Sequence, residues 1–81
     1  MNEYKTSFFA QCPNNQIRIH YFLTIKTTNV IQVEKLLEFV GQMTTGFHET
    51  FSDKLTAQFG GLQTLEADHH GVTITTTRGA Q

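Results

Sequence analysis

The sequence predicts an α+β domain in which a four-stranded antiparallel sheet is covered on one face by two helices, in the order ββααββ. Segments near both ends of the chain alternate apolar and polar residues, which is the period of half-buried strands. The middle of the chain instead has apolar residues three and four positions apart, which is helical spacing. At 81 residues, the chain has the length of a single domain.

The first hairpin is predicted over residues 4–26. Its inward-facing positions are Tyr4, Thr6, Phe8 and Ala10 in the first strand and Ile17, Ile19, Tyr21, Leu23 and Ile25 in the second. Pro13-Asn14-Asn15 is the expected turn, because proline has no N–H for a ladder and asparagine tolerates positive φ. The second strand should therefore begin at about Gln16, which places Cys12 at the mouth of the hairpin.

The first helix is predicted from the change of period near Val30. Its apolar stripe would consist of Val30, Val33, Leu36, Leu37 and Val40. Asn29 is the expected N-cap, since Gln32 stands three residues later in capping-box position.

The second helix is predicted from apolar residues at steps of four: Phe47, Phe51, Leu55 and Phe59. Thr45 is its expected N-cap, and Gly60-Gly61 its C-terminal stop. Its apolar face is aromatic and continuous.

A second hairpin is predicted from residues 62–67 and 72–77, around a turn at Asp68-His69-His70-Gly71. Thr73, Thr75 and Thr77 would lie on the face away from the helices, which we expect to be largely polar. Such a sheet has two free edges, and a chain of this size has a small core. We therefore expect copies to close edge to edge into an oligomeric barrel.

Composition excludes several classes of function. A formal net charge of -1, without a basic run, argues against direct nucleic-acid binding. The single cysteine excludes an internal disulfide and a zinc site with several cysteines, and it fits a reducing compartment. No apolar run approaches the roughly 20 residues of a spanning helix, so a cytoplasmic protein without membrane contact is expected.

Two short motifs carry chemically active side chains. Cys12-Pro13 ends the first strand, and Gly46-Phe47-His48-Glu49 opens the second helix. A thiol, an imidazole and a carboxylate would supply a nucleophile, a proton carrier and an anchor for a ligand. These residues form a site only if the two elements pack together.

The motifs resemble those of the nitrile reductases of queuosine biosynthesis, NADPH-dependent enzymes that act on 7-cyano-7-deazaguanine (preQ0). The resemblance runs from about Phe8 to Gly79 and includes Cys12-Pro13, Val33-Glu34, Gly46-Phe47-His48-Glu49 and Gly71-Val72-Thr73-Ile74. That family has the tunnelling fold (T-fold), whose subunits assemble into barrels with ligand sites between neighbours. The resemblance thus implies a single T-fold domain over residues 1–81 that binds a purine or deazapurine as a homo-oligomer.

Residue by residue, the resemblance implies that Cys12 is the nucleophile that forms a thioimide with the nitrile carbon. His48 would carry or orient a proton, and Glu34 and Glu49 would hold the amide and amino edge of the deazapurine. NADPH as a cofactor is implied by the resemblance alone, and no metal is expected. The chain departs from the family in several respects. No aspartate follows Cys12 within residues 14–19, and the lysines that contact the NADPH phosphates are missing. The spacing from Glu34 to His48 is about one helical turn shorter, and His69-His70-Gly71 replaces the Arg-Gly-Gly of the family's last hairpin.

Two alternatives stay open. Residues 55–58 followed by Glu66-Ala67-Asp68-His69 are similar to GTP cyclohydrolase I, a T-fold zinc enzyme that opens a purine ring. In that case His69 and His70, with Asp68, are candidate metal ligands, although adjacent histidines on a turn point apart. The other alternative is a non-catalytic T-fold module that binds a purine-like ligand or forms a structural ring.

Overall fold

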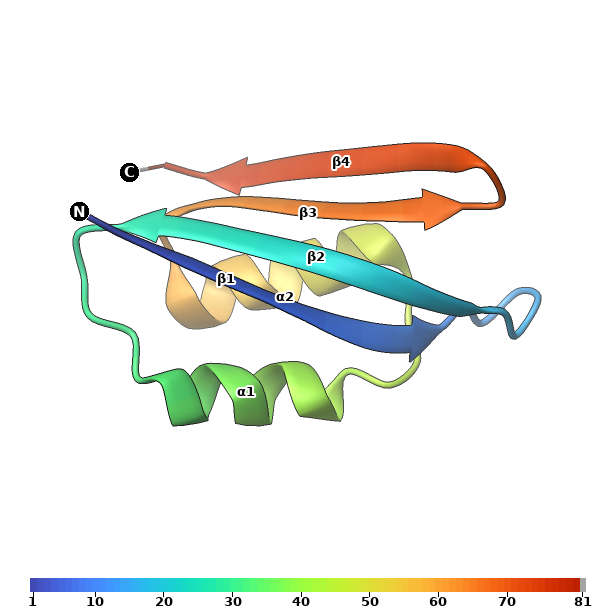
Figure 1. Ribbon diagram of the computed structural model, residues 1–81, viewed down its shortest axis with the longest axis horizontal. Coiled ribbons are helices and arrows are strands. Elements are labelled where there is room, and N and C mark those ends of the chain that lie inside the picture. The colour runs from blue at the N-terminus through green and yellow to red at the C-terminus, as the bar shows by residue number, and fades with distance from the viewer. Residues whose placement is uncertain (81) are drawn as a thin grey trace.

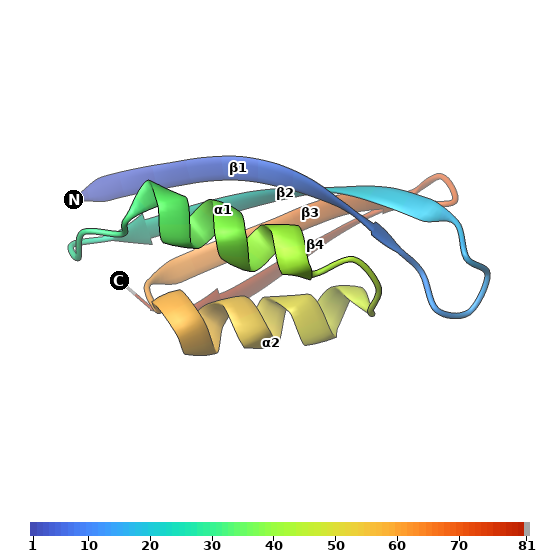
Figure 2. The same cartoon turned by 90° about the horizontal axis from the view of Figure 1, so that it is seen from below.

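The protein consists of two layers, a twisted antiparallel sheet and a pair of helices on one face of it (Figures 1 and 2). The computed structural model describes residues 1–80. The sheet has the strand order β1-β2-β3-β4, and the helices lie between β2 and β3 in the sequence. The elements are β1 (Asn2–Gln11), β2 (Arg18–Thr27), α1 (Val33–Gln42), α2 (His48–Phe59), β3 (Leu62–His69) and β4 (Val72–Gly79). The predicted α+β class and ββααββ order are confirmed.

The core forms between the inner face of the sheet and α2. Phe8 pairs with Tyr21 across β1 and β2, and their rings stack with centroids 5.1 Å apart. Phe51 of α2 meets both rings edge-on, at 5.7 Å from Phe8 and 5.2 Å from Tyr21. Leu55, one turn further along α2, has no exposed surface. Phe51 and Leu55 of the predicted face therefore anchor α2 to the sheet, whereas Phe47 precedes the helix and is 49% exposed, and Phe59 meets Phe39 of α1 edge-on.

α1 differs from the prediction in its start and in its buried face. The helix begins at Val33 after an extended Gln32, so Asn29 is not its N-cap. Its buried side chains are Leu36 and Val40, whereas Val33 and Leu37 are about half exposed. The predicted stripe is therefore buried only in part, and Val30, which precedes the helix, is exposed.

A backbone junction ties the end of β1 to the start of α2. Gln11 forms an isolated bridge with Thr45: its N–H donates to the Thr44 carbonyl at 2.8 Å, and its carbonyl accepts from the Gly46 N–H at 3.3 Å. Thr45 is therefore part of this junction, and Phe47 occupies the N-cap position of α2. The predicted stop at Gly60, with φ of 67°, is confirmed.

Gly46 is required at this junction by close packing. A Cβ at this position would lie 2.7 Å from Cε1 of Phe51, closer than side-chain carbons approach one another. The absent side chain lets the Phe51 ring fill the space under the loop. The junction thereby places Cys12, one residue past Gln11, beside the first turn of α2.

The tips of the two hairpins also touch. The β3–β4 turn consists of His70 and Gly71, with φ of 57° and 90°, as in a type I′ turn. The predicted turn over residues 68–71 was too long, because β3 continues through His69. His70 Nε2 accepts a hydrogen bond from Asn15 Nδ2 at 2.6 Å, so the β1–β2 loop is fastened to this turn.

The outer face of the sheet is polar along β4, where Thr73, Thr75 and Thr77 are exposed as predicted. Across β1 and β2 it instead carries an aromatic cluster that the sequence analysis did not identify. His20 lies between Phe9 and Phe22: its ring stacks on Phe9 with centroids 4.0 Å apart and is tilted against Phe22 at 4.3 Å. Phe9 faces outward because Phe8 faces inward, and successive strand residues alternate between the faces.

Neither helix in residues 1–80 combines the length and the apolar character that crossing a bilayer requires.

Candidate functional site

Three of the four side chains predicted to form the site line one pocket. Cys12, His48 and Glu49 surround a cavity of about 410 Å³, together with Phe47, Thr50, His69 and Ile74. They come from the loop after β1, from the first turn of α2 and from the β3–β4 hairpin. The juxtaposition results from the Gln11–Thr45 junction and from the packing of α2 against β3 and β4.

Cys12 is a free, half-buried thiol in a fixed backbone position. Its N–H donates to the Ile17 carbonyl at 2.9 Å, and its carbonyl accepts from the Gln16 N–H at 2.8 Å. The side chain packs against the edge of the core. Burial is the larger cause that raises the pKa of Tyr21, and the charge of a Cys12 thiolate raises it further.

His48 is the buried member of a pair of histidines. It is 6% exposed, and its Nε2 lies 2.9 Å from the Leu65 carbonyl oxygen. Its Nδ1 lies 2.9 Å from Nε2 of His69 at the end of β3. The Tyr21 ring packs against both imidazoles, with centroid distances of 5.4 Å to His48 and 5.9 Å to His69. Both nitrogens of His48 are thus engaged.

The surroundings of His48 favour its neutral form. Burial is the largest cause that lowers the pKa of His48, and the nearby His69 and Arg78 also lower it. The hydrogen bond to Leu65 and the charge of Glu49 oppose this shift without reversing it. The imidazole is therefore held uncharged within the folded protein at neutral pH.

This shift predicts a loss of stability in mild acid. The unfolded chain binds a proton at His48 near the ordinary pKa of 6.5, whereas the folded chain binds it only at lower pH. The free energy of unfolding should therefore fall as pH drops below about 6.5, by about 1.4 kcal/mol for each unit between the two pKa values. Urea denaturation at a series of pH values measures the slope.

The matched variant is His48→Gln, which keeps an N–H donor for the Leu65 carbonyl but does not titrate. Its stability should change less between neutral and mildly acidic pH than that of the wild type. Equal slopes in the two proteins would contradict the assignment of the acid loss to His48.

Glu49 and Glu34 occupy different ends of the molecule. Glu49 is exposed in the first turn of α2 at the rim of the pocket. Glu34 is exposed in the first turn of α1, and the two helices run in opposite directions, so their first turns lie at opposite ends (Figure 1). Within one chain, only Glu49 can reach a ligand beside Cys12.

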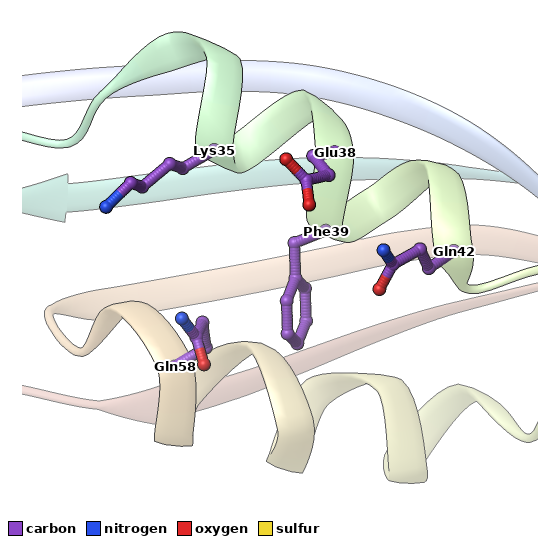
Figure 3. A pocket seen from close by; sticks show the side chains of 5 residues that line it. All are labelled: Lys35, Glu38, Phe39, Gln42 and Gln58. Atoms are coloured by element: carbon purple, nitrogen blue, oxygen red, sulfur yellow. The ribbon is translucent and has the colours of Figure 1, made fainter.

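A second hollow of about 190 Å³ lies between α1 and α2 (Figure 3). Its lining residues are Lys35, Glu38, Phe39, Gln42 and Gln58. It contains no thiol or imidazole and none of the predicted site residues. The pocket at Cys12 is therefore the better candidate for a site with chemistry.

His69 is the residue whose place in the site the sequence analysis missed. It was considered only with His70 as a metal ligand, yet the two side chains diverge: His69 turns inward to His48, and His70 turns to Asn15. Within residues 1–80, no cluster of three or more histidine, cysteine, aspartate or glutamate side chains is arranged to hold a metal ion. The signal for the inward position was the strand alternation, which puts His69 on the same face as Leu65 and Ala67.

No family model, curated protein or solved structure matches this chain.

Proposed function

We propose that this chain is a T-fold subunit that binds a nitrile-bearing deazapurine of the preQ0 type and forms a thioimide with it through Cys12. The observation that carries the proposal is the convergence of Cys12, His48 and Glu49 on one pocket. Cys12 is far from His48 and Glu49 in the sequence, and the three side chains meet only in the folded chain. These residues belong to the short motifs Cys12-Pro13 and Gly46-Phe47-His48-Glu49 on which the resemblance to the nitrile reductases is based.

The pocket has the chemistry that such a ligand requires. Its volume of about 410 Å³ lies within the usual range of small-molecule sites. Phe47 and Ile74 offer apolar contact to a flat ring, and the Glu49 carboxylate can accept two N–H donors from its amide and amino edge. Addition of the Cys12 thiol across the C≡N bond needs no reductant, since the thiol proton ends on the nitrile nitrogen.

The proposed assembly is a homo-oligomeric ring. In the sheet order β1-β2-β3-β4, the outer strands β1 and β4 run antiparallel, so β4 of one copy can pair with β1 of the next around a rotation axis. Closure in this way removes both free edges. Glu34 would then serve a pocket only through a neighbouring subunit.

The ring predicts a multimer at micromolar concentration. Sedimentation velocity over a concentration series should show a single species larger than the 81-residue monomer. The expectation follows from two free strand edges on a small core. A stable folded monomer across the series would remove both the barrel and a site shared between subunits.

Glu49→Gln should weaken binding of preQ0 by about 1.5–3 kcal/mol, the range of a hydrogen bond that involves a charge, which corresponds to a roughly 10- to 150-fold rise in Kd. The amide retains the shape of the side chain but replaces one acceptor by a donor. Titration calorimetry on a Cys12→Ala background separates this binding from the covalent step.

The control for this experiment is Glu38→Gln, which makes the same chemical change in α1, outside the pocket. It should leave the Kd unchanged. Equal affinity of Glu49→Gln and the parent protein would show that the ligand is anchored elsewhere. Guanine and GTP, titrated in parallel, distinguish a nitrile site from a general purine site.

A further inference from the structure

We propose that His69 accepts the thiol proton of Cys12 and delivers it to the nitrile nitrogen. His48 is a positioning residue that holds His69 in place. The identity of the ligand rests on the proposed function. The role of His69 toward the Cys12 thiol stands on the geometry of the pocket.

The Leu65 carbonyl determines the direction of both hydrogen bonds. A carbonyl oxygen only accepts, so the proton of neutral His48 lies on Nε2. His48 Nδ1 is then an acceptor, and the N–H that it accepts must be Nε2–H of His69. In neutral His69 this leaves Nδ1 with a free lone pair. Within residues 1–80, no hydrogen bond engages that atom.

The two histidines are suited to different tasks. His48 is buried with both nitrogens engaged, so it has no free atom to offer a ligand. His69 is half-buried and lines the pocket together with Cys12. When His69 gains a proton on Nδ1, its Nε2–H still donates to His48. The pair can therefore take up one proton and release it without breaking either hydrogen bond.

The groups around the pair are compatible with a transient positive charge on His69. Glu49 lies on the rim of the same pocket, and a carboxylate beside an imidazolium stabilises its positive charge. The cation that acts on His48 is Arg78, and its guanidinium is paired with Asp53 at 3.1 Å. Tyr21 packs on both rings and separates them from the rest of the core. Burial lowers the pKa of His48, so a second proton on that ring is disfavoured.

The step is balanced without another reactant. The Sγ–H proton of Cys12 passes to Nδ1 of His69, and Sγ attacks the nitrile carbon. The S–C bond forms as one π bond of the nitrile breaks, and the electron pair on nitrogen takes the proton back from His69. The product is a thioimide with the mass of protein plus ligand. His69 thereby supplies the proton transfer for which no carboxylate is present in residues 14–19.

The test compares three glutamine variants over a range of pH. In His69→Gln, the side-chain amide can still donate to His48 Nδ1 but cannot carry a proton. In His48→Gln, the side-chain amide keeps an N–H donor for Leu65, and its oxygen replaces ring Nδ1 as an acceptor for His69, but the imidazole that positions His69 is lost. His70→Gln is the matched control, since His70 contacts Asn15 outside the pocket. Two rates are measured: preQ0 adduct formation by intact mass, and alkylation of Cys12 by iodoacetamide.

His69→Gln should slow adduct formation by about 100-fold or more, the range of general acid–base catalysis, and should flatten its pH profile near neutrality. Alkylation at neutral pH should slow as well. His48→Gln should show a smaller loss with a shifted pH profile, and His70→Gln should match the wild type. Wild-type rates and pH profiles in His69→Gln would overturn the inference.

The two measured rates distinguish the proposal about the ligand from the proposal about His69. If the wild type forms no adduct with preQ0 while His69→Gln still slows alkylation, the ligand is wrong and the role of His69 stands. Nitrogen NMR of the wild type supplies a test that needs no variant. It should show neutral His69 protonated on Nε2 and unprotonated on Nδ1, and the opposite tautomer would overturn the inference.

Discussion

Cys12→Ala is expected to abolish covalent modification by preQ0. Intact-mass measurement of the wild type should show an increase equal to the mass of preQ0, because addition to a nitrile has no leaving group. The chain has no other cysteine, and a thiolate is the most nucleophilic side chain near neutral pH. The variant should retain noncovalent binding of the ligand, since Phe47, Glu49 and Ile74 are unchanged.

Addition of NADPH to this experiment tests the reductase reaction itself. The lysines that contact the NADPH phosphates in the nitrile reductases have no counterpart here, so turnover should be weak or undetectable. Brisk NADPH oxidation would show that these departures matter less than proposed. An unmodified wild type under saturating preQ0 would favour the non-catalytic binding module.

Phe51→Ala should destabilise the protein by about 3–5 kcal/mol, the usual cost of removing a buried phenylalanine side chain. Phe51 is 2% exposed and packs on Phe8, Tyr21 and the loop at Gly46. The loss is a large part of the 5–15 kcal/mol that typically stabilises a domain. Denaturant unfolding at fixed protein concentration measures it.

Phe22→Ala is the matched control, because it removes the same side chain from the outer face, where Phe22 is 52% exposed. Its cost should stay below about 1.5 kcal/mol, which covers the tilted ring contact with His20. Similar losses in both variants would contradict the assignment of the core to the side of the sheet that α2 covers. Because Phe51 underlies the first turn of α2, Phe51→Ala should also slow adduct formation at Cys12.

The pattern of residues determined which elements form and which face of each strand is buried. Alternation at Phe8 and Tyr21 predicted the inner face of β1 and β2, and the spacing of Phe51 and Leu55 predicted the buried face of α2. These are local properties, set by the two-residue period of strands and the 3.6-residue period of helices. α2 ends at Gly60 as predicted, because glycine adopts the positive φ that ends a helix, and this preference belongs to the residue itself.

The sequence also indicated Cys12, His48 and Glu49 as one group, through the chemistry of their side chains and through a resemblance, but only on the condition that their two segments pack together. Their contact depends on the bridge between Gln11 and Thr45, which joins segments more than thirty residues apart. No local period encodes such a bridge. It forms because the sheet register and the packing of Phe51 against Gly46 bring the two loops together.

Tertiary structure alone decided three further points. It buried Leu36 and Val40 of the predicted α1 stripe and left Val33 and Leu37 half exposed, because only part of a stripe this wide can face the sheet. It placed Glu34 at the far end of the molecule, because the two helices run in opposite directions. It also brought His69 to His48. The distance between their rings depends on the register of β3 and the position of α2, neither of which follows from the number of residues between them.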